Sequence, residues 1–145
     1  MQKLTLEIAD RMIDEALAEG RRQGFAPLCV AVADAGGHLL ALKRSETASN
    51  LRPQIATGKA RSVLDMGFGG RELARRAERM PAFMAALGHL SGGMVPVPGG
   101  VLIRNEQGEL LGAIGISGDT SDNDEICAVA GIRAVGLVPD TGDAG

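Results

Sequence analysis

The sequence predicts an α/β fold of the α+β type, in which an antiparallel sheet carries helices on both faces. Two pairs of short apolar segments are each joined by a tight-turn signal, at residues 34–37 and 105–109. Strands joined by tight turns pair antiparallel. Segments with helical spacing of apolar residues precede, separate and follow the two pairs. Because the strand segments look apolar on both faces, we expect helices on both sides of the sheet.

The N-terminal part is expected to form one helix and the first strand pair. Residues 5–23 have a stripe of apolar side chains at helical spacing, and Gly24 suits a helix end. Residues 26–34 are almost all apolar and predict a strand covered on both faces. The turn at 34–37 contains Gly36 and Gly37, and residues 38–42 return as the partner strand.

The remaining elements follow from the same periodicities. In order, we expect helices at 55–66, 70–77 and 81–90, a glycine- and proline-rich loop at 91–100, strands at 101–104 and 110–117, and a helix at 122–136. At 145 residues, the chain is predicted to form a single domain spanning 1–145. Residues 136–145 are predicted to be a frayed polar tail.

Composition narrows the classes of partner. The net charge is −3, whereas nucleic-acid surfaces need clustered Lys and Arg, so we expect no nucleic-acid partner. With no Trp, no Tyr and three Phe, a base-stacking surface is also disfavoured. No apolar run approaches the length of a membrane span, so no membrane partner is expected. Two cysteines in apolar surroundings and no recognisable signal peptide favour a reducing, cytoplasmic location.

An acidic cluster occupies residues 122–125, with the sequence Asp-Asn-Asp-Glu. Closely spaced carboxylates can bind a hard cation. Acidic residues also complement the dipole of a first helical turn, and Asp122 with Glu125 has the spacing of a capping box. We therefore favour a helix cap over a metal site as the role of this cluster.

The two histidines have different surroundings in the sequence. His38 follows a glycine turn and is interpreted as a surface residue. His89 precedes the loop at 91–100 and could ligate haem iron or act as an acid or base. The side chains that could line an apolar haem slot around it are Met80, Phe83, Met84 and Met94. No CxxCH motif is present, which excludes covalent c-type attachment.

Several basic and small residues are candidates for holding an anion. Lys59 interrupts an apolar helical run: it either points inward to an anion or lies solvated with its stem on apolar surface. Arg61 and Arg104 could each clamp a carboxylate. Ser117 and Gly118 stand between a strand and a helix, where backbone N–H groups can hold an anion. Ser117 lacks a GxSxG context, so a hydrolase triad is not expected.

The sequence resembles the GlcG/HbpS group of small proteins, which includes the C-terminal domain of PduO. The motifs that carry the resemblance are VAVADAGGHL at 30–39, Lys-Ala at 59–60, Pro-Gly-Gly at 98–100, GAIGISG at 112–118 and Asp-Glu at 124–125. They are specific for a fold family, and none is a catalytic signature. The resemblance implies a profilin-like sheet of about five strands, assembly into homo-oligomers and haem as a cofactor.

Three functions follow from these candidates. The first is a module that binds haem or another planar or anionic small molecule between the loop at 91–100, the helix around Lys59 and the turn at 117–125. His89 would be the axial ligand, and the other expected contacts are Lys59, Arg61, Gly99, Gly100, Arg104, Ser117 and Gly118. The second is a cofactor-free isomerase, tautomerase or lyase of a small organic acid, with Lys59, His89 or Asp124 moving the proton. The third is an accessory subunit without a ligand.

Overall fold

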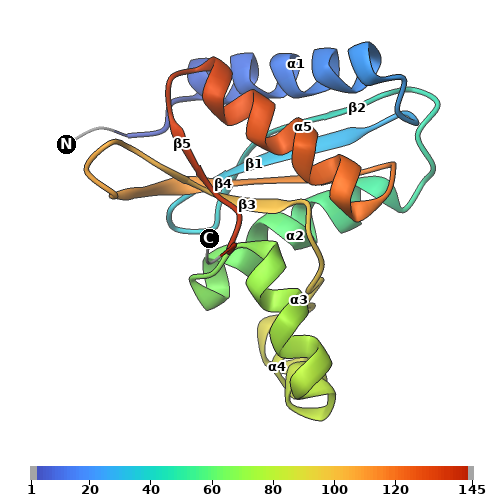
Figure 1. Cartoon of the computed structure of the whole chain (residues 1–145), viewed down its shortest axis with the longest axis vertical. Helices are drawn as coiled ribbons and strands as arrows, with labels where there is room; N and C mark the ends of the chain where they lie inside the picture. The colour runs from blue at the N-terminus through green and yellow to red at the C-terminus, as the bar shows by residue number, and fades with distance from the viewer. Residues whose placement is uncertain (1–2, 144–145) are drawn as a thin grey trace.

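A computed structural model describes residues 3–143 of the chain. These residues form five α-helices and five β-strands (Figure 1). In chain order the elements are α1 (Leu6–Gln23), β1 (Cys29–Asp34), β2 (Leu39–Arg44), α2 (Arg52–Met66), α3 (Gly70–Arg79), α4 (Pro81–Ser91), β3 (Gly100–Arg104), β4 (Leu110–Ser117), α5 (Ser121–Ala134) and β5 (Val138–Asp140). The predicted order of helices and hairpins is confirmed.

The strands form one sheet in the order β2-β1-β4-β3-β5, and every neighbouring pair is antiparallel. The two hairpins meet through β1 and β4, which pair from Cys29–Ser117 to Asp34–Gly112. Helices α1 and α5 cover one face of this sheet, and α2 covers the other (Figure 1). The predicted antiparallel α+β fold with helices on both faces is therefore confirmed.

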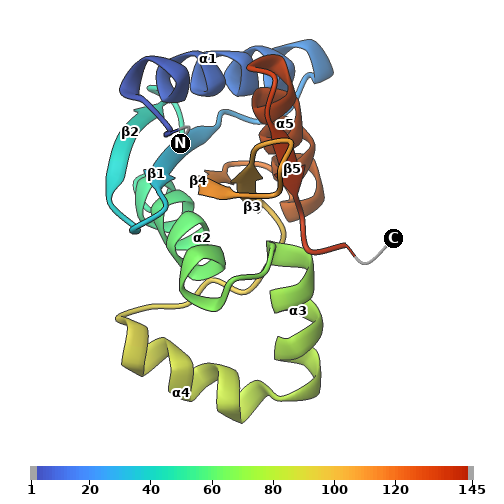
Figure 2. The same ribbon diagram turned by 90° about the vertical axis from the view of Figure 1, so that its left-hand side faces the viewer.

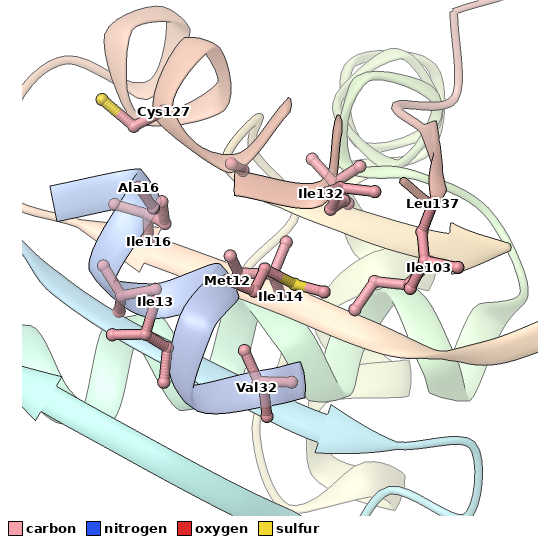
Figure 3. Packing of buried hydrophobic residues seen from close by; sticks show 14 of the residues in the cluster. Met12, Ile13, Ala16, Val32, Ile103, Ile114, Ile116, Cys127, Ile132 and Leu137 are labelled. Carbon is pink, nitrogen blue, oxygen red and sulfur yellow. The ribbon is translucent and has the colours of Figure 1, made fainter. Parts of the chain in front are cut away.

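The larger core lies between the sheet and the α1–α5 pair. Figure 3 shows Met12 and Ile13 of α1 and Ile132 of α5 gathered around Ile114 and Ile116 of β4. All five side chains are fully buried. Apolar burial of this kind contributes roughly 1.5–3 kcal/mol for each large side chain, so this core fixes the layers.

On the opposite face, α2 lies unusually close to the sheet. A Cβ atom added to Gly115 of β4 would overlap the carbonyl oxygen of Ala56. At Gly100 of β3, an added Cβ would lie 2.6 Å from the carbonyl oxygen of Lys59. Two of the glycines in the strands thus allow the backbone of α2 to pack directly on the sheet.

Helices α3 and α4 and residues 92–98 project away from the sheet, and we call this part of the molecule the arm (Figure 2). Leu73 anchors α3 in a small core with Leu102 and Ala113. Met84 is buried on α4, whereas Phe83 and Leu90 are exposed. Helix α3 is therefore anchored to the sheet at its base.

The prediction of a frayed tail from residue 136 is wrong for the described part of that segment. Val138–Asp140 form β5, which pairs with β3 from Arg104–Val138 to Leu102–Asp140. Three residues that include a proline give too short a pattern to indicate a strand, and Pro139 is tolerated because β5 is an edge strand. Residues 144 and 145 lie outside the described range.

Across residues 3–143, no helix has both the length and the apolar character needed to cross a membrane.

Candidate functional site

Lys59 and Asp124 form a buried ion pair. Lys59 Nζ donates a hydrogen bond to Asp124 Oδ2 at 3.1 Å, and the two side chains are 3% and 1% exposed. The pair joins α2 on one face of the sheet to the first turn of α5 on the other (Figure 1). The inward orientation of Lys59, one of the two alternatives left open by the sequence, is the one observed.

Burial acts on the two charges in opposite directions. It lowers the pKa of Lys59, against the attraction of Asp124, and the nearby charge of Arg52 lowers it further. It raises the pKa of Asp124, against the attraction of Lys59 and a hydrogen bond from the backbone N–H of Asp119. Both shifts favour the neutral forms of the two groups, and in each case the charge of the partner opposes the shift.

The glycines around this pair provide room for it. Gly99 has φ of 112°, and an added Cβ would lie 2.7 Å from Lys59 Nζ. At Gly118, an added Cβ would overlap the carbonyl oxygen of Pro27. Gly99 and Gly100 therefore enclose Lys59, and Gly118 allows two loops to cross.

Arg52 joins the same cluster and was not among the residues singled out from the sequence. Its Nη1 donates to the buried Ser117 hydroxyl at 3.1 Å, and its Nε donates to Ser49 Oγ. Arg52 and Lys59 are seven residues apart, two turns of α2, and so lie on one helix face. That spacing is the signal that could have identified Arg52.

Arg61 lies elsewhere, because two residues along a helix rotate the side chain by about 200° from Lys59. It lines a cavity of about 390 Å³ between α2 and the start of the loop at 92–98. The other lining residues are Pro53, Gln54, Thr57, Gly58, Gly92, Gly93 and Val95. Arg61 Nη2 donates to the carbonyl oxygen of Ser91 at 3.2 Å, and Arg61 takes part in none of the ion pairs found among residues 3–143.

The loop beside Arg61 is tied to α2. Ser62 accepts a hydrogen bond from the backbone N–H of Val95 at 2.9 Å and donates one to the carbonyl oxygen of Gly58 at 2.6 Å. A Cβ on Gly58 would lie 2.8 Å from Val95. This wall of the cavity is thus built by backbone and small side chains, and Thr57 and Gln54 are two more polar residues missed from the sequence.

His89 is exposed on α4 and lines an adjoining cavity of about 360 Å³ with Ala85, Gly88, Gly92 and Gly93. The two cavities share Gly92 and Gly93. We call them together the α2–α4 groove. Of the expected apolar lining, Met84 is buried in the arm, while Phe83 and Met80 are exposed and line neither cavity.

The remaining candidates lie outside both clusters. Arg104 is at the far end of β3 from Gly100, and its Nε donates to Asp140 Oδ2 at 3.0 Å. His38 is an exposed residue whose backbone N–H and ring contact Asp34 Oδ1. The structure therefore does not bring Arg104 or His38 to Lys59, Arg61 or His89.

The predicted capping box of Asp122 with Glu125 is wrong, whereas the expected acidic first turn is present, with Asp122 and Asp124 in the first turn of α5. The N-cap of α5 is Thr120, whose hydroxyl accepts from the backbone N–H of Asn123 at 3.1 Å. Asp122 and Glu125 accept hydrogen bonds from Arg71 of α3. Within the described range, the structure holds no group of three or more His, Cys, Asp or Glu arranged to bind a metal ion.

Known proteins resemble this chain along most of its length. The family described as haem degrading protein HbpS-like matches residues 4–133. Protein GlcG of Escherichia coli is 33% identical over 120 residues, which cover 79% of this chain and 81% of GlcG. Among crystal structures, a complex of PduOC with haem has a TM-score of 0.85 at 24% identity and covers 98% of this chain and 100% of that one. The structure of HbpS has a TM-score of 0.81 at 28% identity and covers 94% and 92%.

The resemblance to the GlcG/HbpS group is thus confirmed both by sequence and by fold, and the chain belongs to the HbpS-like family.

Proposed function

We propose that this protein binds haem or another planar, anionic small molecule in the α2–α4 groove. The observation that carries the proposal is the position of Arg61 and His89 on two sides of the shared Gly92–Gly93 turn. Arg61 brings a positive charge without a carboxylate partner in the described residues, and His89 brings an exposed imidazole. A guanidinium and an imidazole are the groups that a propionate and a haem iron would need.

The chemistry of the groove fits such a ligand. The Arg61 guanidinium is oriented by the carbonyl oxygen of Ser91 and retains N–H donors for a carboxylate. Pro53 and Val95 supply apolar wall, and Thr57 supplies a hydroxyl. The iron of a bound haem would supply coordination to a neutral imidazole and an intense visible absorption that reports binding.

The description of the matching family and one similar structure support the ligand class. The family is described as haem degrading, and the PduOC structure is a complex with haem. Haem remains the first ligand to test here, because Arg61 and His89 belong to this chain's own groove.

The primary experiment is a haemin titration followed by visible absorbance, with His89→Ala compared with wild type. We expect a saturable Soret shift in the wild type and its loss or displacement in the variant. His38→Ala is the matched control, because His38 is also exposed but lies at the β1–β2 turn. Weak, non-saturating binding by the wild type, or equal loss in both variants, would contradict the proposal.

Arg61→Gln tests the anion contact separately. Loss of one charge-assisted hydrogen bond should weaken haemin binding by about tenfold. Arg11→Gln, a change to an exposed arginine on α1, should leave the affinity unchanged. An Arg61 variant with wild-type affinity would place the carboxylate contact elsewhere.

The Lys59–Asp124 pair favours a second candidate, proton transfer on a small organic acid. Buried acids and bases with shifted pKa values recur at catalytic sites, and structural ion pairs show the same shifts. The test is deuterium incorporation in D₂O, at C2 of small 2-hydroxy acids and at C3 of small 2-oxo acids, measured by proton NMR. Exchange that is lost in Lys59→Met, with the fold retained, would support the enzyme. If neither exchange nor haemin binding occurs, the accessory-subunit alternative gains support.

Self-association through α4 is part of the proposal. Helix α4 has no acidic or Lys/Arg residue, and it exposes Phe83 and Leu90, the latter 84% exposed. Exposed apolar surface of this kind marks interaction sites. Light scattering should give a multiple of the 14.9 kDa chain mass, reduced by Phe83→Glu with Leu90→Glu. A monomeric wild type would contradict this part of the proposal.

A further inference from the structure

A second cavity lies between α3 and residues 96–98, and we call it the α3 cavity. Its volume is about 520 Å³. Figure 2 shows the two segments that flank it, α3 and the chain leading into β3. The lining residues are Arg71, Ala74, Arg75, Ala77, Glu78, Pro96, Val97 and Pro98. It shares no lining residue with the α2–α4 groove, so the two can be tested independently.

Five of the eight lining residues of the α3 cavity are small or apolar. Ala74 and Ala77 leave space that longer side chains would fill, and Pro96 and Pro98 present rings without N–H donors. At its base, the backbone of Gly70 packs against the carbonyl oxygen of Val97 so closely that an added Cβ would overlap it. The distance between the two walls is therefore set by backbone contact at the base.

Two arginines on α3 are among the lining residues, and hydrogen bonds fix the orientation of both guanidiniums. Arg71 Nε donates to Glu125 Oε1 at 3.0 Å, and its Nη2 donates to Asp122 Oδ1 at 2.8 Å. Arg75 Nε donates to Glu72 Oε1 at 2.8 Å, and its Nη2 donates to the carbonyl oxygen of Gly142.

In neither arginine does the other terminal nitrogen, Nη1, take part in these bonds within the described residues. Each guanidinium has five N–H donors, two of them on Nη1. The Nη1 of Arg71 and the Nη1 of Arg75 therefore remain for a ligand. Arg71 and Arg75 are one helical turn apart, and a single carboxylate can bind both.

We propose that the α3 cavity binds a small carboxylate with a branched aliphatic body. The carboxylate would accept hydrogen bonds from Arg71 and Arg75, and the body would contact the alanine and proline walls. Glu78 is the acidic residue of the lining and follows Arg75 by one turn. Its charge opposes a second acidic group on the ligand, which favours monocarboxylates over dicarboxylates.

The experiment is a titration of ¹⁵N-labelled full-length protein with 4-methylpentanoate, followed by amide chemical shifts. We expect saturable shifts confined to residues 71–78 and 96–98. The neutral analogue 4-methylpentanamide has almost the same shape and should bind at least about tenfold more weakly. Equal binding of acid and amide, or no saturable shift in these residues, would overturn the proposal.

Three variants locate the ligand. Arg75→Gln should weaken the binding of 4-methylpentanoate about tenfold. Ala77→Leu should block binding by filling the cavity, and its amide spectrum should remain that of a folded protein. Glu78→Gln should tighten binding, because it removes a negative charge from the lining. Arg61→Gln should have no effect. Binding that survives Ala77→Leu, or that is lost in Arg61→Gln, would place the carboxylate outside the α3 cavity and overturn the assignment.

Discussion

The sheet with α1, α2 and α5 differs from the arm in how closely its residues are packed and in how completely its polar side chains are paired. In the sheet layers, Lys59 and Asp124 neutralise each other, and Gly115 is in backbone contact with α2. In the arm, His89 is exposed, and cavities lie on both sides of residues 92–98. Function is therefore expected where packing is incomplete, supported by layers whose packing is close.

This difference leads to different expected effects of substitutions in the two regions. Substitutions in the sheet layers should change stability strongly, whereas those in the arm should change stability little and ligand binding more.

Asp124→Ala should have the largest effect on stability. It leaves the Lys59 amine buried without its partner, and breaking a buried pair in this way typically costs about 3–5 kcal/mol. Urea unfolding followed by circular dichroism measures the change. The double variant Asp124→Leu with Lys59→Met removes both charges and should recover much of the loss. If Asp124→Ala unfolded like the wild type, the pair would not be a structural link between α2 and α5.

Gly115→Ala should follow in size. The new Cβ would overlap the carbonyl oxygen of Ala56, so α2 must move away from β4, at about 1–3 kcal/mol. The same urea experiment applies. Wild-type stability in this variant would show that α2 is not held against the sheet by backbone contact.

Gly88→Ala is the matched change in the arm and should have the opposite sign. Gly88 lies inside α4, and an added Cβ meets Met94 at ordinary contact distances of 3.7 Å or more. Replacing a helical glycine by alanine stabilises a helix by up to about 1 kcal/mol. Destabilisation comparable to Gly115→Ala would contradict the contrast between the arm and the sheet layers.

The sequence predicted most of the fold because the signals are local. The apolar runs in β1 and β4 and the helical spacing in α1 extend over enough residues to identify each element. Strand β5 was missed because three residues carry no periodicity. Thr120 was missed as the N-cap because the acidic residues two and five positions later also match capping preferences.

The site was less predictable, because its contacts join residues far apart in sequence. Lys59 and Asp124 are 65 positions apart, and nothing local indicates that they meet. Lys59 and Arg61 were assigned to one pocket, whereas helix geometry turns them to different faces. Arg104 was a candidate until β5 supplied Asp140 as its partner, and that strand had no signal of its own.

The smallest expected effect is the pH dependence of the exposed ion pairs on α3. Hydrogen bonds from Arg76 and then Arg75 lower the pKa of Glu72 from its ordinary value of 4.5. A lowered pKa means that the contact stabilises the fold above about pH 4.5 and that this contribution is lost as pH falls through the folded-state pKa. The melting temperature of Glu72→Gln should therefore lie slightly below wild type near neutral pH and converge with it once the pH falls below the folded-state pKa of Glu72. High salt should reduce the gap for Glu72→Gln because exposed charges are screened. If the difference in melting temperature persisted at low pH, Glu72 would contribute through packing rather than charge. Helix α3 would then be stabilised by close packing, as the sheet layers are.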